Sequence, residues 1–223
     1  GKSPDNVYDS YVSTYLQRDV RQILNIKDLS LFQKFLTIVA SRVGNVFIAS
    51  SIASELGVDY KTIQSWMSIL ETSYTAFLLQ PFHRNIGKRL TKTPKIYFYD
   101  IGLVCHLLGI ENEQHIKNHP LRGAVFENMV VCEMLKKRYN KGLKSNLYFY
   151  RDQSAEVDVI QEEAGSIKAY EIKSAERFNQ EFTKSLSYVQ KLLGDEISSS
   201  YIIYSGEEEI KFKNFSLINY HNL

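Results

Sequence analysis

Four side chains in the second half of the sequence have the types and order that metal-dependent chemistry requires. The run KAYEIKSAE, residues 168–176, alternates like a β-strand and carries Glu171 and Lys173 on one face. The preceding run AEVDVIQ also alternates and carries Asp158, and the turn EEAGS between the two runs predicts an antiparallel pair. Asp158 and Glu171 are therefore expected on the same face of adjacent strands.

Strict alternation makes a specific prediction for the first of these strands. Val157 and Val159 should point to one face of the sheet, whereas Glu156, Asp158 and Ile160 should point to the other.

Two carboxylates on neighbouring strands repel each other unless a cation lies between them. Mg²⁺ suits such a position because it binds oxygen ligands and keeps several waters. Lys173, on the same face as Glu171, could orient or help to deprotonate a metal-bound water, or stabilise developing negative charge. The chemistry that this set predicts is metal-dependent hydrolysis of a phosphodiester.

A third acid, Glu127, lies in the run VFENMVVCEML, which predicts a helix that is apolar around most of its circumference. A carboxylate in such surroundings needs a partner, so a lysine or the metal site is expected beside it. Each of these residues alone has an ordinary explanation: a solvated ion pair, an edge aspartate or an exposed helical glutamate. The ordered set, helix Glu, strand Asp and strand Glu-x-Lys, is what indicates a site.

The elements that must position these residues form a mixed α/β unit. A helix at AVFENMVVCEMLKKRY is followed by strands at LYFYRD, AEVDVIQEE and IKAYEIKS, a helix at EFTKSLSYVQKLLG, and strands at SSYIIYSG and EIKFKNFSLINY.

The first half predicts helices and then a helix-turn-helix. A helix that begins at Ser50 or Ser51 should end at Leu56–Gly57, and Asp59 should cap a second helix over 60–70. The runs YTAFLLQPF and KIYFYD then predict a wing hairpin, which would make the unit a winged helix.

A basic segment without acids, HRNIGKRLTKTPK, separates the two runs of the expected wing. A basic hairpin tip beside a helix-turn-helix could bind phosphates, although a solvated loop or a contact with another protein domain would have the same composition. The candidate nucleic-acid-binding residues are Lys61, Arg84, Lys88, Arg89, Lys92 and Lys95.

Composition sets limits on the protein class. The 223 residues are 44% hydrophobic and 23% charged, with a net charge of +2, so a nucleic-acid surface must be a local patch. Cys105 and Cys132 lie in apolar runs and are expected to be small buried hydrophobes in a reducing, cytoplasmic compartment. No apolar run reaches the ~18–20 residues of a membrane span, so no membrane partner is expected.

The succession of motifs resembles the PD-(D/E)xK nuclease fold, whose restriction-endonuclease-like core is α-β-β-β-α-β. The chain as a whole resembles the C-terminal part of a bacterial and archaeal family of AAA-type ATPases with an appended domain of unknown function. The matching segments are YLQRDV at 15–20, KRLTKTPKIYFYDIGLVCHLLGI at 88–110, RGAVFENMVVCEML at 122–135, LYFYRDQSAEVDVI at 147–160 and YEIKS at 170–174.

The resemblance implies a site of Glu127, Asp158, Glu171 and Lys173, with Mg²⁺ or Mn²⁺ held by Asp158, Glu171 and the backbone carbonyl of Ile172. Glu156, Arg151 and Asp152 also match the family pattern without an assigned role. Val157 stands where many relatives have proline before the aspartate.

The resemblance also implies an N-terminal ATPase domain as a partner that this chain lacks, because nothing here matches Gly-x-x-x-x-Gly-Lys-Ser/Thr. Related nucleases often act as dimers, so a homo-oligomer is a further expectation.

Three parts are expected along the chain: a helical linker region over 1–45, a winged helix-turn-helix domain over 46–118 and a nuclease-like domain over 119–223. The expected function is that of a DNA-binding, metal-dependent nuclease that acts with the ATPase and leaves 5′-phosphate ends. The alternative is a DNA- or protein-docking module that keeps the fold without turnover. A winged-helix transcription regulator would account for residues 45–100 but not for the C-terminal half.

Overall fold

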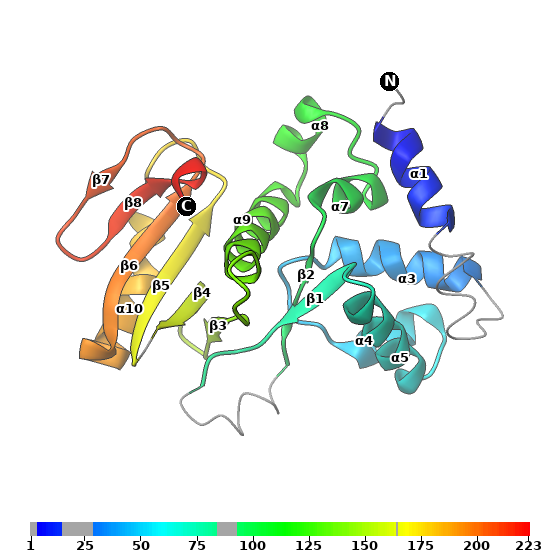
Figure 1. The fold of residues 1–223 in the computed structure, drawn as a ribbon, viewed down its shortest axis with the longest axis horizontal. Coiled ribbons are helices and arrows are strands. Elements are labelled where there is room, and N and C mark those ends of the chain that lie inside the picture. The colour runs from blue at the N-terminus through cyan, green and yellow to red at the C-terminus, as the bar shows by residue number, and fades with distance from the viewer. Residues whose placement is uncertain (1–3, 15–28, 84–92, 164) are drawn as a thin grey trace. The chain divides into compact units, whose positions relative to one another are not determined.

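The computed structural model describes residues 4–14, 29–83, 93–163 and 165–223 (Figure 1). The chain divides into two compact units. The first unit contains residues 1–78 and 96–125, and the second contains residues 79–95 and 126–223. The expected mixed α/β class is confirmed. The two units interleave along the chain. The expected three-part division stays a prediction.

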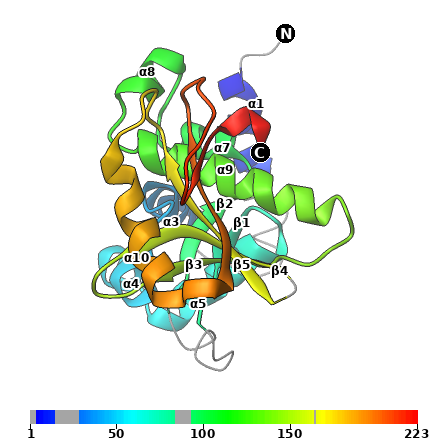
Figure 2. The same ribbon diagram turned by 90° about the vertical axis from the view of Figure 1, so that its left-hand side faces the viewer.

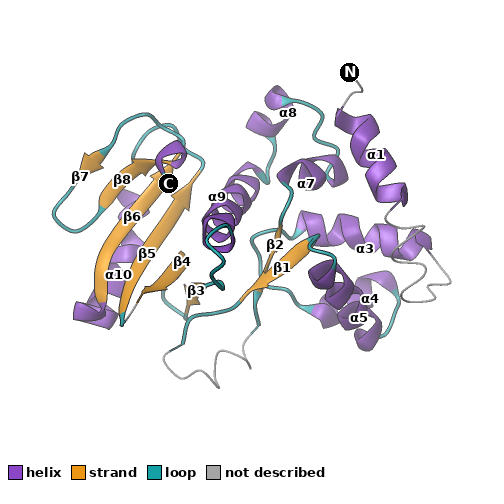
Figure 3. Cartoon of the chain, viewed as in Figure 1, coloured by secondary structure: helices purple, strands orange, loops and turns teal. Residues whose placement is uncertain are grey.

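The first unit is mostly helical, as Figure 3 shows. Its described elements are α1 (Pro4–Thr14), α3 (Leu29–Ser41), α4 (Ala49–Leu56), α5 (Tyr60–Thr72), α7 (Ile101–Leu107) and α8 (Glu113–Asn118). Phe32 and Phe35 of α3 pack their rings against Trp66 of α5, with ring centroids 5.3 and 5.4 Å from the indole. The helix before residue 45 therefore shares one hydrophobic core with the helices that follow it.

The predicted helix–turn–helix is present as α4, a turn and α5. Gly57 ends α4 in the left-handed region, at φ 67°, which a residue without Cβ adopts without strain. Asp59 caps α5 by accepting a 3.0 Å hydrogen bond from the Thr62 N–H. The expected start of α4 was wrong: the helix begins at Ala49, after Ile48, and no side chain caps it.

Two short strands, β1 (Ala76–Leu79) and β2 (Lys95–Phe98), form a two-stranded sheet at the position expected for a wing. The backbone N–H of Tyr99 also donates to the Thr75 carbonyl beside this sheet. Residues 84–92, which contain most of the predicted basic tip, lie outside the described residues.

The second unit is built on a six-stranded sheet with the order β3-β4-β5-β6-β8-β7. Its elements are α9 (Arg122–Tyr139, from Phe126 onward), β3 (Leu147–Arg151), β4 (Glu156–Glu163), β5 (Ser166–Lys173), α10 (Lys184–Leu193), β6 (Ile197–Tyr204), β7 (Ile210–Lys211) and β8 (Ser216–Asn219). The pairs β3–β4 and β4–β5 are antiparallel, whereas β5–β6 and β6–β8 are parallel.

Helix α10 covers one face of this sheet and lies behind it in Figure 1. Its apolar stripe, Leu186, Val189 and Leu193, packs on the strands at the helical spacing that an amphipathic element requires. In the turned view of Figure 2 the strands run between α9 and α10. The central strands are thus covered by helices, which explains why β4 and β5 are apolar along much of their length.

One strand of the expected topology is divided in two. The run EIKFKNFSLINY forms a hairpin of β7 and β8, in which Ile210 pairs with Leu217. The hairpin turns between Phe212 and Phe215, where the Phe212 N–H donates to the Phe215 carbonyl.

Residues that precede the basic segment extend the other edge of the sheet. Pro81 forms a parallel bridge with Phe149 of β3, and the Phe82 N–H donates a 2.6 Å hydrogen bond to the Phe149 carbonyl. The ring of Phe82 belongs to the same hydrophobic core as α10. Residues 79–83 are therefore part of the second unit although they lie far from it in sequence.

Cys132 is buried and Cys105 is half-buried, and both are free thiols. None of the helices in the described part of the chain is both long enough and apolar enough to span a bilayer.

Candidate functional site

A β-bulge on β4 places Asp158. Tyr148 of β3 pairs with Ile160 and Tyr150 pairs with Val157, so that Phe149 alone faces both Asp158 and Val159. The extra residue breaks the alternation of the strand, and Val157 and Ile160 both enter the core under α10. The prediction that these two residues point to opposite faces was therefore wrong, because strict period 2 does not hold across a bulge.

The side chain of Asp158 takes the role of a strand partner for β5. Ile172 N–H donates a 2.7 Å hydrogen bond to Asp158 Oδ2. Regular β4–β5 pairing ends at Val159 and Tyr170, so the carboxylate satisfies a backbone donor just beyond the point where the two strands part. Asp158 is 7% exposed, and this bond fixes its orientation at the end of the ladder.

Glu171 and Lys173 form the ion pair that the Glu-x-Lys spacing suggested. Lys173 Nζ lies 2.6 Å from Glu171 Oε1, and the side chain of Glu171 is 7% exposed whereas that of Lys173 is one-third exposed. The second carboxylate oxygen, Glu171 Oε2, is buried and has no hydrogen-bond partner among the described residues. An unpartnered buried acceptor is uncommon and costly.

The surroundings of Glu171 disfavour its charged form. Burial, and then the neighbouring carboxylate of Asp158, raise the pKa of Glu171 to about 8, although Lys173 opposes the shift. For Lys173, burial acts to lower the pKa, but the carboxylates of Asp158, Glu171 and Glu127 together raise it. The lysine is therefore held as a cation next to an acid that is short of counter-charge.

Glu127, on α9, contacts a lysine that the sequence suggested for another role. Lys95 Nζ lies 3.1 Å from Glu127 Oε1 and 2.6 Å from Glu156 Oε1, and Lys95 is 2% exposed. Burial acts to lower the pKa of Lys95, but Glu127, Asp158 and Glu156 raise it above its ordinary value. The prediction of Lys95 as a phosphate-binding residue of an exposed hairpin tip was wrong: its ammonium is buried among carboxylates.

The adjacent residues Arg151 and Asp152, here called the RD motif, explain how Glu156 is placed beside Lys95. Asp152 Oδ1 accepts hydrogen bonds from the backbone N–H groups of Ser154 and Ala155, at 2.7 and 2.9 Å, and so closes the turn between β3 and β4. Arg151 Nε lies 3.3 Å from Glu156 Oε2, whereas Lys95 Nζ lies 2.6 Å from Glu156 Oε1. Both residues of the motif therefore position Glu156.

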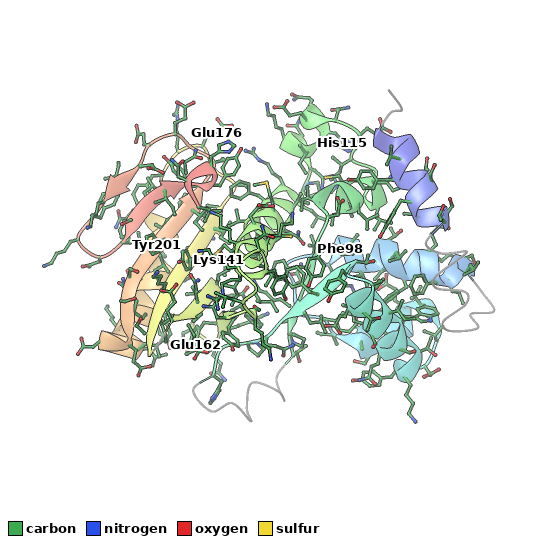
Figure 4. All side chains as sticks on the ribbon, viewed as in Figure 1. Phe98, His115, Lys141, Glu162, Glu176 and Tyr201 are labelled. Carbon is green, nitrogen blue, oxygen red and sulfur yellow. The ribbon has the colours of Figure 1, made fainter. Side chains whose placement is uncertain are left out.

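The four predicted residues lie in one electrostatic cluster. Glu127, Asp158 and Lys173 each act on Glu171, and Glu127, Asp158 and Glu171 each act on Lys173. Figure 4 draws the side chains of the described residues and labels Glu162, in β4, and Glu176, which follows β5 in the sequence. The catalytic role of the four predicted residues stays a prediction.

The predicted metal ligands are present without a complete metal-binding arrangement of side chains. Among the described residues, no three His, Cys, Asp or Glu side chains are placed to hold one ion together. The backbone N–H of Ile172, the residue expected to offer its carbonyl, binds Asp158.

The predicted nucleic-acid-binding residues divide into three groups. Lys61 is exposed near the start of α5. Lys95 is buried, as described above. Arg84, Lys88, Arg89 and Lys92 lie outside the described residues.

Sequence reasoning assigned Lys95 to the wrong surface and missed its place in the cluster. The signal available was its position in KIYFYD, where a lysine opens an otherwise apolar run. β2 is buried at all four of its residues, so the lysine at its start is buried too and must be paired.

The fold and cluster define a two-unit mixed α/β protein with a buried carboxylate–lysine centre in the second unit. Residues 2–114, half of the chain, match a family model described as a domain of unknown function, DUF8612, and the chain belongs to this family. Residues 122–223 match a second model, the domain of unknown function DUF4143, a domain often found in AAA-ATPase-associated proteins.

Two curated relatives are similar along most of the chain. They are the uncharacterized proteins Rv2008c of Mycobacterium tuberculosis and Mb2031c of Mycobacterium bovis, each 30% identical over 203 residues. The match covers 89% of this chain but 44% of each relative, so the chain spans less than half the length of these proteins.

Proposed function

We propose that the second unit is a metal-dependent phosphodiesterase domain of the PD-(D/E)xK type that acts on DNA. The order α9, β3, β4, β5, α10, β6 supports this proposal, because an antiparallel three-stranded segment followed by a parallel crossover is the arrangement of that core. Such a core could also serve other purposes, so the residues at its centre must distinguish this function from others.

The observation that carries the proposal is the unpartnered, buried Oε2 of Glu171 beside Asp158. Two adjacent carboxylates with one free acceptor fit a hard divalent cation, which would supply the counter-charge that Glu171 lacks. Mg²⁺ commonly takes only one or two protein carboxylates and completes its shell with water and phosphate oxygens, so a third acidic ligand is not required.

Asp158 and Glu171, with the Ile172 carbonyl, would hold Mg²⁺ or Mn²⁺. When bound, the ion would supply Lewis-acid activation of water and of the phosphate. Lys173 offers a partly exposed ammonium at the same place, which can bind a phosphate oxygen or orient a water. Asp158 keeps its position through the Ile172 N–H, and Glu127 holds Lys95 at the edge of the cluster.

The first unit would bind the DNA on which this site acts. The exposed residues of α5 include four polar side chains that could enter a groove, Lys61, Gln64, Ser65 and Ser68, and also Tyr60, Glu71 and Thr72. The β1–β2 sheet would be the wing. The match covers 44% of each relative, which supports a place for this chain in a larger protein. An ATPase domain as its partner, a cytoplasmic location and a homo-oligomer are further parts of the proposal.

A specific observation favours the second candidate, a docking module without turnover. Glu127 is held by a buried lysine, and no three acidic side chains among the described residues are arranged around one point. This arrangement would be expected if the centre were retained for stability alone.

Cleavage assays separate the two functions. The 223-residue chain is incubated with supercoiled, linear and branched DNA in Mg²⁺ or Mn²⁺, and wild type is compared with Asp158→Ala and Lys173→Ala. Lys168→Ala is a matched control, because Lys168 lies on the same strand and pairs with Glu163 at 2.8 Å, away from the cluster.

Cleavage by wild type and by Lys168→Ala, with loss in both site variants, would support the phosphodiesterase. Equal activity in all four proteins would indicate a contaminating nuclease. Salt-sensitive DNA binding without cleavage would support the docking module.

A further inference from the structure

Lys95 is the most deeply buried charged side chain in the described part of the second unit. It is 2% exposed, it lies 5.5 Å from the centre of the Phe149 ring, and it enters the unit at the start of β2. An ammonium in such a place is costly unless it is fully paired. Its two carboxylate contacts, with Glu127 and Glu156, supply that pairing.

The contacts divide the charged cluster into two halves. In one half, Lys95 joins Glu127 to Glu156, and Arg151 contacts the other oxygen of Glu156. In the other half, Lys173 contacts one oxygen of Glu171, and Asp158 is bound by a backbone N–H. The unpartnered oxygen belongs to Glu171 in this second half.

We propose that the ammonium of Lys95 is the built-in counter-ion of Glu127 and Glu156. Only Asp158 and Glu171 then remain as side-chain ligands for a metal ion. Lys95 is thus a positioning residue of the site, and Glu127 acts through Lys95 and does not ligate the metal. This inference rests on the proposed metal site and assigns the roles within it.

The sign of the effect on metal affinity follows from charge. Lys95 acts electrostatically on Asp158, and Glu156, which it contacts at 2.6 Å, lies two residues from Asp158 on β4. A positive charge that interacts with Asp158 opposes the binding of a second cation there. Removing Lys95 should therefore tighten metal binding, although it weakens the support of Glu127.

The test measures binding of Mn²⁺ alone to the full chain, by electron paramagnetic resonance of the free ion. Glu171→Gln should weaken binding by at least roughly tenfold because a ligand is lost, and Lys95→Met should tighten it by about tenfold. Glu127→Gln, which keeps Lys95 paired with Glu156, removes a negative charge but no ligand, so it should weaken binding clearly less than Glu171→Gln does. Lys168→Met and Glu163→Gln are matched controls, because they remove a lysine–glutamate pair elsewhere in the same sheet.

Lys95→Arg provides a conservative comparison and should keep the wild-type affinity, since the charge stays. If Lys95→Met does not fold, the comparison of the Mn²⁺ affinities of Glu127→Gln and Glu171→Gln still tests the inference.

An equal loss of affinity in Glu127→Gln and Glu171→Gln would overturn this inference and leave the metal site intact. Unchanged or weaker binding by a folded Lys95→Met would overturn it as well. Absence of Mn²⁺ binding by wild type would overturn both the inference and the metal site beneath it.

Discussion

The Ile172 N–H donates a 2.7 Å hydrogen bond to Asp158 Oδ2, and this bond joins β4 to β5 at the point where their regular pairing ends. The same carboxylate is the proposed metal ligand. Asp158 therefore has a structural role and a proposed chemical role, and suitable substitutions can separate the two.

Asp158→Ala should reduce the free energy of unfolding by about 1–3 kcal/mol, because it leaves the buried Ile172 N–H without an acceptor. Asp158→Asn keeps an amide oxygen in the same place and relieves repulsion with Glu171, so it should cost less. Both substitutions should abolish cleavage. Urea denaturation in EDTA measures the first effect and the DNA assay the second. Equal destabilisation by Asn and Ala would contradict the structural role of the hydrogen bond.

The stability of the metal-free protein should depend on pH through Glu171. Its pKa rises from an ordinary value of 4.5 to about 8 in the folded protein, so the folded state binds the extra proton between these values. The contribution of this proton to the free energy of unfolding is fully present below about pH 4.5 and is lost as the pH rises through about 8.

Glu171→Gln should remove this fall in stability with rising pH, because glutamine does not titrate. In EDTA, its stability relative to wild type should increase between about pH 5 and about pH 8 by on the order of 1 kcal/mol or more. Urea unfolding at each pH provides the measurement, and Glu163→Gln controls for the loss of one carboxylate at a more open position on the same hairpin. A relative stability that stays flat with pH would argue against the crowded carboxylates.

Gly57 tests the turn of the helix–turn–helix. Because its φ is 67° and an added Cβ would meet nothing within 4 Å, Gly57→Ala should destabilise the fold through backbone conformation alone, by about 1–2 kcal/mol. Gly57→Asn should cost less, since asparagine tolerates the left-handed region. Thermal unfolding of the two variants gives the comparison. If alanine were as stable as glycine, the turn would not require this conformation.

Lys61 tests the DNA-binding proposal for the first unit. Lys61→Gln should weaken DNA binding and lower the slope of log affinity against log salt by about 1 if its ammonium contacts a phosphate. Lys34→Gln, at an exposed position of α3, is the matched control. Fluorescence anisotropy with duplex DNA at several salt concentrations would show the difference. Parallel changes in both variants would place the DNA elsewhere.

Local signals predicted most of the elements. The cap at Asp59, the glycine at 57 and the alternation around Glu171 depend on interactions within a few residues, and each has the expected structure. The order of helices and strands in the second unit followed in the same way. The start of α4 could not be predicted because no side chain caps it.

Long-range features were beyond the reach of local patterns. The bulge at Asp158 depends on how Phe149 faces two residues of β4, and the alternation of side chains along a strand does not predict it. The burial of Lys95 depends on Glu127 and Glu156, which are 32 and 61 positions away. The sequence could indicate that Glu127 needs a partner, but it could not identify that partner.

The bridge between Pro81 and Phe149 matters for anyone who wishes to produce the second unit separately. A recombinant fragment cut at residue 122, where the second family match begins, would lack Phe82 and Lys95. It would expose the outer edge of β3 to aggregation through unpaired backbone groups and would deprive Glu127 of its counter-ion. A fragment intended to stay monomeric and folded must therefore carry residues 79–95, supplied either in the same polypeptide or as a second chain.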